Sequence, residues 1–178
     1  MITSCLTSYT LYWTRSALVE DNWEGIADRY AELVRGRSAT YQFSRDVLLN
    51  ALSGKVFGLD VLDVGCGEAI VSRAPATAGA RVVGIDPTRT LIADAEAAEH
   101  APLAGVIYRV DDGTTLHTVP DISMDGVPAA LSLNNMADLD AAPGLVQRVL
   151  RSGGWFAFTV PHPCFEAPCH QDHRTPPP

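Results

Sequence analysis

Residues 62–70 read LDVGCGEAI, an apolar run that leads to two glycines separated by a cysteine, with a single acid, Asp63, two positions before the first glycine. Glycine has no Cβ, so Gly65 and Gly67 let the backbone turn tightly and come close to a ligand. In α/β sheets, ligands bind at the carboxyl ends of the strands, where the strand order reverses. The stretch therefore predicts a buried strand followed by a ligand-binding loop.

Apolar segments alternate with helical ones along the rest of the chain. The predicted strands are 59–64, 80–85, 105–110, 126–133 and 155–160. The predicted helical connections are 70–79, 88–100 and 140–154. Several of these strands are apolar on both faces, which is typical of a parallel sheet covered by helices. The pattern predicts an α/β fold with a mostly parallel sheet of about five strands.

The N-terminal part has a different character. Apolar residues recur at intervals of three and four over 22–36, which predicts an amphipathic helix that stops at Gly36, and a second helical pattern covers 43–54. We expect a single domain. Its parts are a helical cap over 1–54, a core over 55–160 that carries the glycine loop, and an irregular tail over 161–178.

The composition restricts the possible partners. With 47% hydrophobic and 19% charged residues, a chain of 178 residues can bury a core. The 13 basic residues against 21 acidic ones give a net charge of −8, and no basic cluster stands out, so nucleic acid and membranes are not expected partners. The apolar runs are too short to span a bilayer, and four scattered cysteines do not indicate a disulfide framework. We expect a cytoplasmic protein with reduced thiols.

The spacing to a second acid indicates a nucleotide-like ligand. Asp86 ends the second predicted strand, where a carboxylate accepts hydrogen bonds from ribose hydroxyls. A dinucleotide site usually has a third glycine three residues after the second, but that position is Ile70. A carboxylate at Asp63 would also repel a pyrophosphate. Both residues argue against a nicotinamide-dependent oxidoreductase.

The chain resembles the class I S-adenosylmethionine-dependent methyltransferases from about Trp23 to Phe165. The first motif of this family is an acid followed by any residue and then by glycines at alternate positions. The resemblance implies a Rossmann-like three-layer sandwich preceded by N-terminal helices, with the family's last strands missing. S-adenosylmethionine carries an ammonium and a sulfonium, so an acidic loop would attract it. In the alternative interpretation, Asp63 only caps or orients the loop backbone.

The resemblance also implies roles for individual residues. It places the methionine part of the cofactor against Gly65 and Gly67, and the ribose against Asp86. The product is then S-adenosylhomocysteine. The expected cofactor-binding residues are Asp63, Gly65, Cys66, Gly67, Asp86, Pro87, Asp112, Gly113 and Asn134.

One of these assignments has a competitor. Asp112 matches the acid that pairs with the adenine amino group, and Gly113 then brings a backbone N–H near the ring. Asp111 is adjacent and is the competing assignment. Leu116 favours Asp112, because it then falls where the family has an apolar residue.

The acceptor side is less defined. His162, just after the last predicted strand, is the best-placed histidine for a catalytic base toward a hydroxyl acceptor, or it packs in its turn between two prolines. His117 is a weaker candidate. Tyr30 and Trp23 either cover the cofactor as a lid or belong to the core.

Four features depart from the family pattern. Ala69 replaces the third glycine of the motif, Pro75 falls in a predicted helix, and Pro128 falls in a predicted internal strand. The segment 155–160 would also form a sheet edge with large apolar side chains. We expect either a second copy to cover this edge, which gives a homodimer, or an impaired protein.

The expected function is methyl transfer to a small-molecule acceptor. The alternative is a catalytically impaired or truncated methyltransferase-like protein for binding or dimerisation. The cysteines and histidines of the tail do not have a standard zinc spacing, so no metal is expected.

Overall fold

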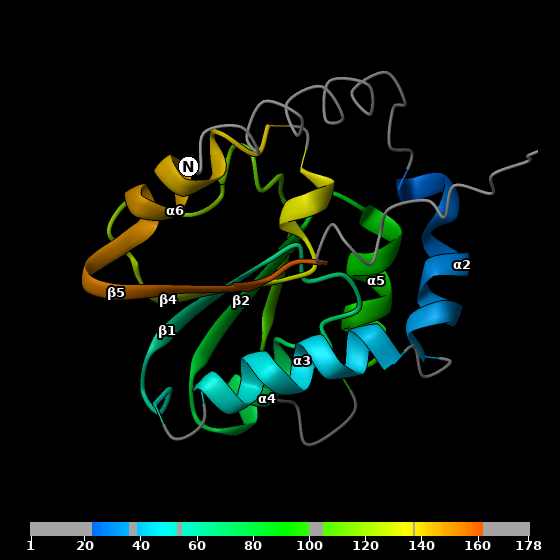
Figure 1. Ribbon diagram of the computed structural model, residues 1–178, viewed down its shortest axis with the longest axis horizontal. Helices are drawn as coiled ribbons and strands as arrows, with labels where there is room; N and C mark the ends of the chain where they lie inside the picture. Colours follow the sequence, from blue (N-terminus) through cyan, green and yellow to red (C-terminus); the bar gives the residue numbers. More distant parts are fainter. Residues whose placement is uncertain (1–22, 36–38, 53–54, 100–104, 137, 162–178) are drawn as a thin grey trace, which may run out of the picture.

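The computed structural model describes residues 23–35, 39–52, 55–99, 105–136 and 138–161. Two helices come first, α2 (Trp23–Arg35) and α3 (Ala39–Leu52). The remaining elements, shown in Figure 1, are β1 (Asp60–Val64), α4 (Arg73–Thr77), β2 (Arg81–Asp86), α5 (Arg89–Ala97), β3 (Ile107–Val110), β4 (Met124–Ala130), a 3-10 turn η1 (Leu133–Asn135), α6 (Ala142–Val149) and β5 (Leu150–Thr159).

The strands form one parallel sheet in the order β3-β2-β1-β4-β5. The chain runs outward from β1 to β3 and then returns to β4 on the other side of β1. The order therefore reverses between β1 and β4, which is where open α/β sheets bind ligands. The predicted α/β class, the five parallel strands and the N-terminal helices are confirmed.

Helices cover both faces of the sheet, as Figure 1 shows. Alternate side chains of a strand point to opposite faces, so Val61 packs with Leu48 and Leu52 of α3, while Leu62 packs with Val146 of α6. A third, smaller cluster joins α2 to α5. Asp63 has the parity of Val61, so the buried acid points to the face that carries α3 and α4.

The prediction for residues 70–79 was only partly right. Turns extend to Ser72, and the helix α4 covers only Arg73–Thr77. Pro75 therefore lies in the first turn, where the backbone N–H has no partner within the helix. The cost of an interior proline, which we expected from the sequence, is avoided.

Pro128 lies inside β4, as predicted, and is buried. The residue pairing between β1 and β4 is confined to Val61 and Gly126, and Pro128, two residues farther on, has no N–H to extend a ladder. The pairing of β4 with β5 continues past it as far as Ala130. The proline is therefore tolerated because the ladder between β1 and β4 does not extend to it.

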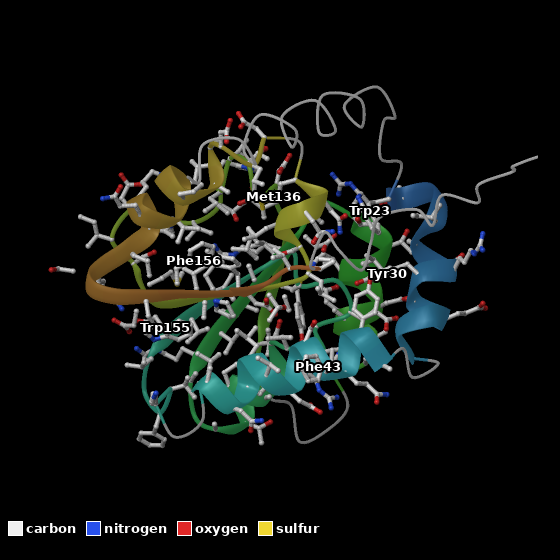
Figure 2. The ribbon with its side chains drawn as sticks, viewed as in Figure 1. Trp23, Tyr30, Phe43, Met136, Trp155 and Phe156 are labelled. Atoms are coloured by element: carbon white, nitrogen blue, oxygen red, sulfur yellow. The ribbon has the colours of Figure 1, made fainter. Side chains whose placement is uncertain are left out.

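β5 lies at the edge of the described sheet, as the sequence predicted. Figure 2 shows Trp155 and Phe156 on opposite sides of this strand, and each packs against one of the two cores. Phe158 is 51% exposed and Val160 is 48% exposed. Within the described residues, no helix is long and apolar enough to cross a membrane.

Candidate functional site

The glycine loop turns sharply at the end of β1. Gly65 and Gly67 have φ values of 69° and 51°, in the left-handed region that other residues rarely adopt. A Cβ on Gly65 would lie 2.4 Å from the Cβ of Ser132, whose hydroxyl donates a hydrogen bond to the Val64 carbonyl at 2.7 Å. Gly65 is therefore required for the loop after β1 to contact the loop after β4.

Asp86 ties the loops after β1 and β2 together. One carboxylate oxygen accepts a hydrogen bond from the Gly67 N–H at 3.0 Å, and the other accepts from the Thr88 N–H at 2.9 Å. Burial raises the pKa of Asp86. A carboxylate has about four lone-pair sites, so the group keeps capacity for a further donor such as a ribose hydroxyl.

Asp63 is 1% exposed and accepts a hydrogen bond from the Ser72 hydroxyl at 2.5 Å. Burial raises its pKa to about 6, and the negative charge of Asp86 adds to the rise. Asp63 therefore orients the residue that precedes α4, and it also lines the cleft described next. The two interpretations left open by the sequence are compatible.

A cleft open to solvent lies between the glycine loop, the end of β4 and helices α2 and α3. Its lining residues are Tyr30, Tyr41, Ser44, Arg45, Asp63, Gly65, Cys66, Glu68, Ile70, Val71, Ala130 and Leu131.

Three of the predicted cofactor-binding residues, Asp63, Gly65 and Cys66, line this cleft. Burial raises the pKa of Cys66, so its thiol stays protonated. The other six predicted residues lie in neighbouring loops rather than in the cleft wall, and they are Gly67, Asp86, Pro87, Asp112, Gly113 and Asn134.

An aromatic wall borders the cleft. Tyr30 makes edge-to-face contacts with Trp23 and Tyr41, with ring centroids 5.6 and 5.7 Å apart. A Cβ on Gly67 would lie 3.6 Å from the Tyr30 ring, so this ring lies over the glycine loop, and Figure 2 shows it projecting from α2 toward α3. Burial raises the pKa of Tyr30, which keeps the phenol neutral. Tyr30 thus serves both as packing and as a cover for the loop.

The loop after β3 distinguishes the two adjacent acids. Asp111 is buried and accepts hydrogen bonds from the Asp112 N–H and from the N–H and hydroxyl of Thr118. Burial raises its pKa, but the bonds from Thr118 and Asp112 outweigh this effect and lower it. Asp112 is exposed and accepts one bond, from the Thr114 N–H at 2.8 Å. Asp112 is therefore the acid of this pair that is open to a ligand.

His117 contributes to the same loop. Its Nδ1 lies 2.6 Å from a carboxylate oxygen of Asp111, and its side chain is exposed. It does not line the cleft. Gly113 lies beneath Met136, since a Cβ there would come within 2.6 Å of the Met136 methyl carbon.

Asn134 lies in η1, after β4. Its amide nitrogen donates to Asn135 at 3.0 Å, whereas its carbonyl oxygen is buried and accepts no hydrogen bond from the described residues. A buried acceptor normally has a donor. The predicted catalytic residue, His162, lies outside the described residues.

Sequence analysis missed the wall that α3 contributes, Tyr41, Ser44 and Arg45. The predicted second helix began at residue 43, whereas α3 begins at Ala39. A signal was present: Ser44 and Tyr41 continue the four- and three-residue spacing of the core residues Leu52 and Leu48 toward the N-terminus. Glu68, a buried acid in the cleft wall, was also missed.

Known proteins resemble the chain in sequence and in fold. A family model described as a methyltransferase domain matches residues 62–158. A nocamycin O-methyltransferase from Saccharothrix syringae is 38% identical over 60% of this chain and 39% of its own length. A malonyl-[acyl-carrier protein] O-methyltransferase from Serratia marcescens is 30% identical over 78% of this chain and 53% of its own.

Solved structures agree with these relatives. The crystal structure of an S-adenosylmethionine-dependent methyltransferase from Mesorhizobium loti superimposes with a TM-score of 0.62 and 32% identity, over 70% of this chain and 57% of that one. The chain thus spans about half the length of the proteins it matches. The matched family model covers more than half of the chain. Together with the strand order and the glycine loop, this match shows that the protein belongs to the class I S-adenosylmethionine-dependent methyltransferases.

Proposed function

We propose that the chain transfers a methyl group from S-adenosylmethionine to an oxygen of a small-molecule acceptor. The observation that carries the proposal is the arrangement of the glycine loop and acids at the carboxyl ends of β1, β2 and β3, beside a cleft open to solvent. Two curated relatives are named as O-methyltransferases of nocamycin and of ubiquinone biosynthesis, which supports oxygen as the acceptor atom.

The residues fit the cofactor. The buried carboxylate of Asp63 lies at the cleft wall, where it would attract a cationic ligand, and the Asn134 carbonyl oxygen offers an acceptor that the described residues leave unused. Asp86 would hold the ribose, with Pro87 and the neighbouring Gly67 backbone beside it. Asp112 and Gly113 would meet the adenine.

When bound, the cofactor supplies an electrophilic methyl carbon on a sulfonium. The contribution of this chain is to hold the acceptor in line and to exclude water. Tyr30 covers the loop on one side, and Tyr41 and Arg45 of α3 line the cleft, where they would contact the acceptor. For a hydroxyl acceptor, His162 remains our candidate for the base that takes the proton.

The alternative, a catalytically impaired binding or dimerisation protein, was based partly on the two prolines. Pro75 lies in a first helical turn and Pro128 lies beyond the end of the β1–β4 ladder, so both are accommodated without loss of the site. The structure therefore removes that part of the case for impairment.

Calorimetric titration with S-adenosylhomocysteine tests the proposal, with NAD as a control ligand. We expect micromolar binding of the former and none of the latter. Asp112→Ala should weaken binding about 10- to 100-fold, the range for loss of a hydrogen bond to a charged group. The matched control is Asp138→Ala, because Asp138 is also exposed and also accepts one backbone N–H, from Ala141.

Three outcomes would contradict the proposal: a folded wild type that does not bind S-adenosylhomocysteine, tight binding of NAD, or equal effects of the two variants. If binding is found, transfer of a labelled methyl group to phenolic, carboxylic and amine acceptors then identifies the acceptor atom. Methylation of amines alone would exclude oxygen.

A further inference from the structure

A single carboxylate connects the N-terminal helix α2 to the start of α5. One oxygen of Glu24 accepts a hydrogen bond from the Arg89 N–H at 2.9 Å, and the other accepts from the Thr90 N–H at 3.2 Å and from the Thr90 hydroxyl. These residues are 65 and 66 positions apart in the sequence. The contact therefore joins the helical cap to the core.

Glu24 caps α5 from outside that helix. The first N–H groups of a helix have no partner within it, and the residue before the helix normally supplies a side-chain acceptor. Thr88 occupies that position, but its side chain makes no capping bond. The Glu24 carboxylate takes over this role, and its negative charge suits the positive end of the helix dipole. The Thr90 hydroxyl bond is the main factor that lowers the pKa of Glu24.

The rest of the contact between α2 and α5 is small. Figure 1 shows the two helices side by side, and their shared buried cluster consists of Ala27, Ala31 and Leu91, with Tyr30 beside it. Alanine side chains allow close approach but bury little apolar area. The directional bonds of Glu24 therefore set the position of α2 along α5.

The position of α2 matters because it carries Tyr30, which lies over Gly67. The other end of the connection reaches the same loop, since the Thr88 N–H donates to Asp86 and the Gly67 N–H donates to Asp86 as well. Glu24 thus fixes both Tyr30 and the start of α5 relative to the glycine loop.

We propose that Glu24 is a positioning residue for cofactor binding, which clamps α2 to the start of α5 and thereby holds Tyr30 over the glycine loop. The inference rests on the proposed function, because it needs a cofactor at that loop. Glu24 would act without contacting the cofactor, by fixing the position of the helix that carries Tyr30.

The experiment combines hydrogen exchange of the α2 amides with titration by S-adenosylhomocysteine. The variants are Glu24→Ala, Glu24→Gln and, from the opposite side of the contact, Thr90→Val. Glu32→Ala is the matched control, since Glu32 is an exposed acid eight residues farther along the same helix. Glu24 is exposed, so the core of Glu24→Ala should stay folded.

We expect Glu24→Ala to speed exchange in α2 and to weaken S-adenosylhomocysteine binding about tenfold, the order of effect that loss of a helix cap has on an equilibrium. Glu24→Gln, which keeps one acceptor oxygen, should fall between Glu24→Ala and the wild type. If the clamp is a single unit, Thr90→Val should add less to Glu24→Ala than it costs alone.

Unchanged exchange in Glu24→Ala would overturn the clamp. Faster exchange with unchanged affinity would overturn its role in cofactor binding. A wild type that does not bind S-adenosylhomocysteine would refute the proposed function instead, and hydrogen exchange would still report on the clamp.

Discussion

The two sides of strand β1 are joined to the sheet in different ways. On the β2 side every residue of β1 has a partner in register, and the loops beyond are linked by the Gly67 to Asp86 hydrogen bond. On the β4 side the pairing is confined to Val61 and Gly126, and the register of β4 with β5 shifts just before Gly126. The backbone ladder is therefore continuous on the β2 side of β1, while on the β4 side it is interrupted and the sheet ends at an apolar edge strand.

The largest effect is expected from Gly65→Ala, where the loop after β1 contacts the loop after β4. A Cβ there would lie 2.4 Å from the Ser132 Cβ, and the residue has a φ of 69°. Left-handed backbone costs about 1–2 kcal/mol and forcing an atom into packed structure about 1–3 kcal/mol, so we expect a loss of roughly 2–5 kcal/mol in the free energy of unfolding. Urea denaturation measures this loss.

Gly58→Ala separates backbone strain from the steric clash. Gly58 has a φ of 75° but no atom within 4 Å of the Cβ position. It should therefore lose only the strain, about 1–2 kcal/mol. Equal losses in the two variants would contradict the close contact between the loops after β1 and β4.

The second prediction concerns the carboxylate of Asp63, which is buried in β1. The pKa of Asp63 is about 6 in the folded protein and 3.8 in a model peptide. Between these values Asp63 binds more protons in the folded state, so the contribution of this residue to stability should fall as the pH rises from about 4 to about 6. At about 1.36 kcal/mol per unit, the difference of 2.2 units amounts to roughly 3 kcal/mol as an order of magnitude.

Asp63→Asn should remove this pH dependence and raise the melting temperature at pH 7.5, while weakening the binding of cationic S-adenosylmethionine. A site residue that destabilises the fold is a common trade-off between stability and activity. Melting curves from pH 4 to pH 7.5 test it. A lower melting temperature for the variant at pH 7.5 would show that the Ser72 hydrogen bond matters more than the buried charge.

The difference between the two sides also explains how far sequence reasoning reached. On the β2 side, local patterns decide the structure, because the strands predicted at 59–64 and 80–85 are observed at Asp60–Val64 and Arg81–Asp86. On the other side, the segment predicted as helix over 140–154 is helix only to Val149, and β5 begins at Leu150. The pairing of Met124 with Leu150 extends β5 to its early start, and such a long-range contact leaves no local signal.

The candidate site shows the same limit. Asp63, Gly65 and Cys66 could be assigned to the cleft because a motif of consecutive residues carries them. The α3 wall and the Glu24 clamp depend on the packing of the helical cap against the core, and the clamp connects residues 65 and 66 positions apart. Ala69 was only partly predictable. The motif showed that it replaces a glycine, but only the structure shows that its φ is 64°, a backbone conformation that glycine adopts more readily.

The third prediction concerns the β4 side of the sheet and uses the variant Gly126→Ala. A Cβ there would lie 2.1 Å from the Trp155 ring, closer than the contact at Gly65. Gly126 does not have a positive φ, and Trp155 is a half-buried side chain on an edge strand that can move aside. We therefore expect a smaller loss than for Gly65→Ala, about 1–2 kcal/mol by urea denaturation. A larger loss would mean that the edge is as rigid as the glycine loop.

The smallest effect on stability, but a clear one on assembly, is expected from Phe158→Lys on β5. Phe158 is 51% exposed on the edge strand, and an apolar edge favours pairing with another chain, which lysine opposes. We predict that the wild type forms dimers in sedimentation velocity as its concentration rises and that the variant stays monomeric. Stability should change by only about 0.5 kcal/mol, as for most surface substitutions.

Phe43→Lys is the matched control, because Phe43 is 72% exposed but lies on helix α3 rather than on the edge strand. If association requires the edge strand, this variant should dimerise as the wild type does. Loss of dimers in both variants would indicate nonspecific hydrophobic association. A wild type that is monomeric at every concentration would contradict the homodimer, and the apolar edge strand β5 would then be stable without a partner strand.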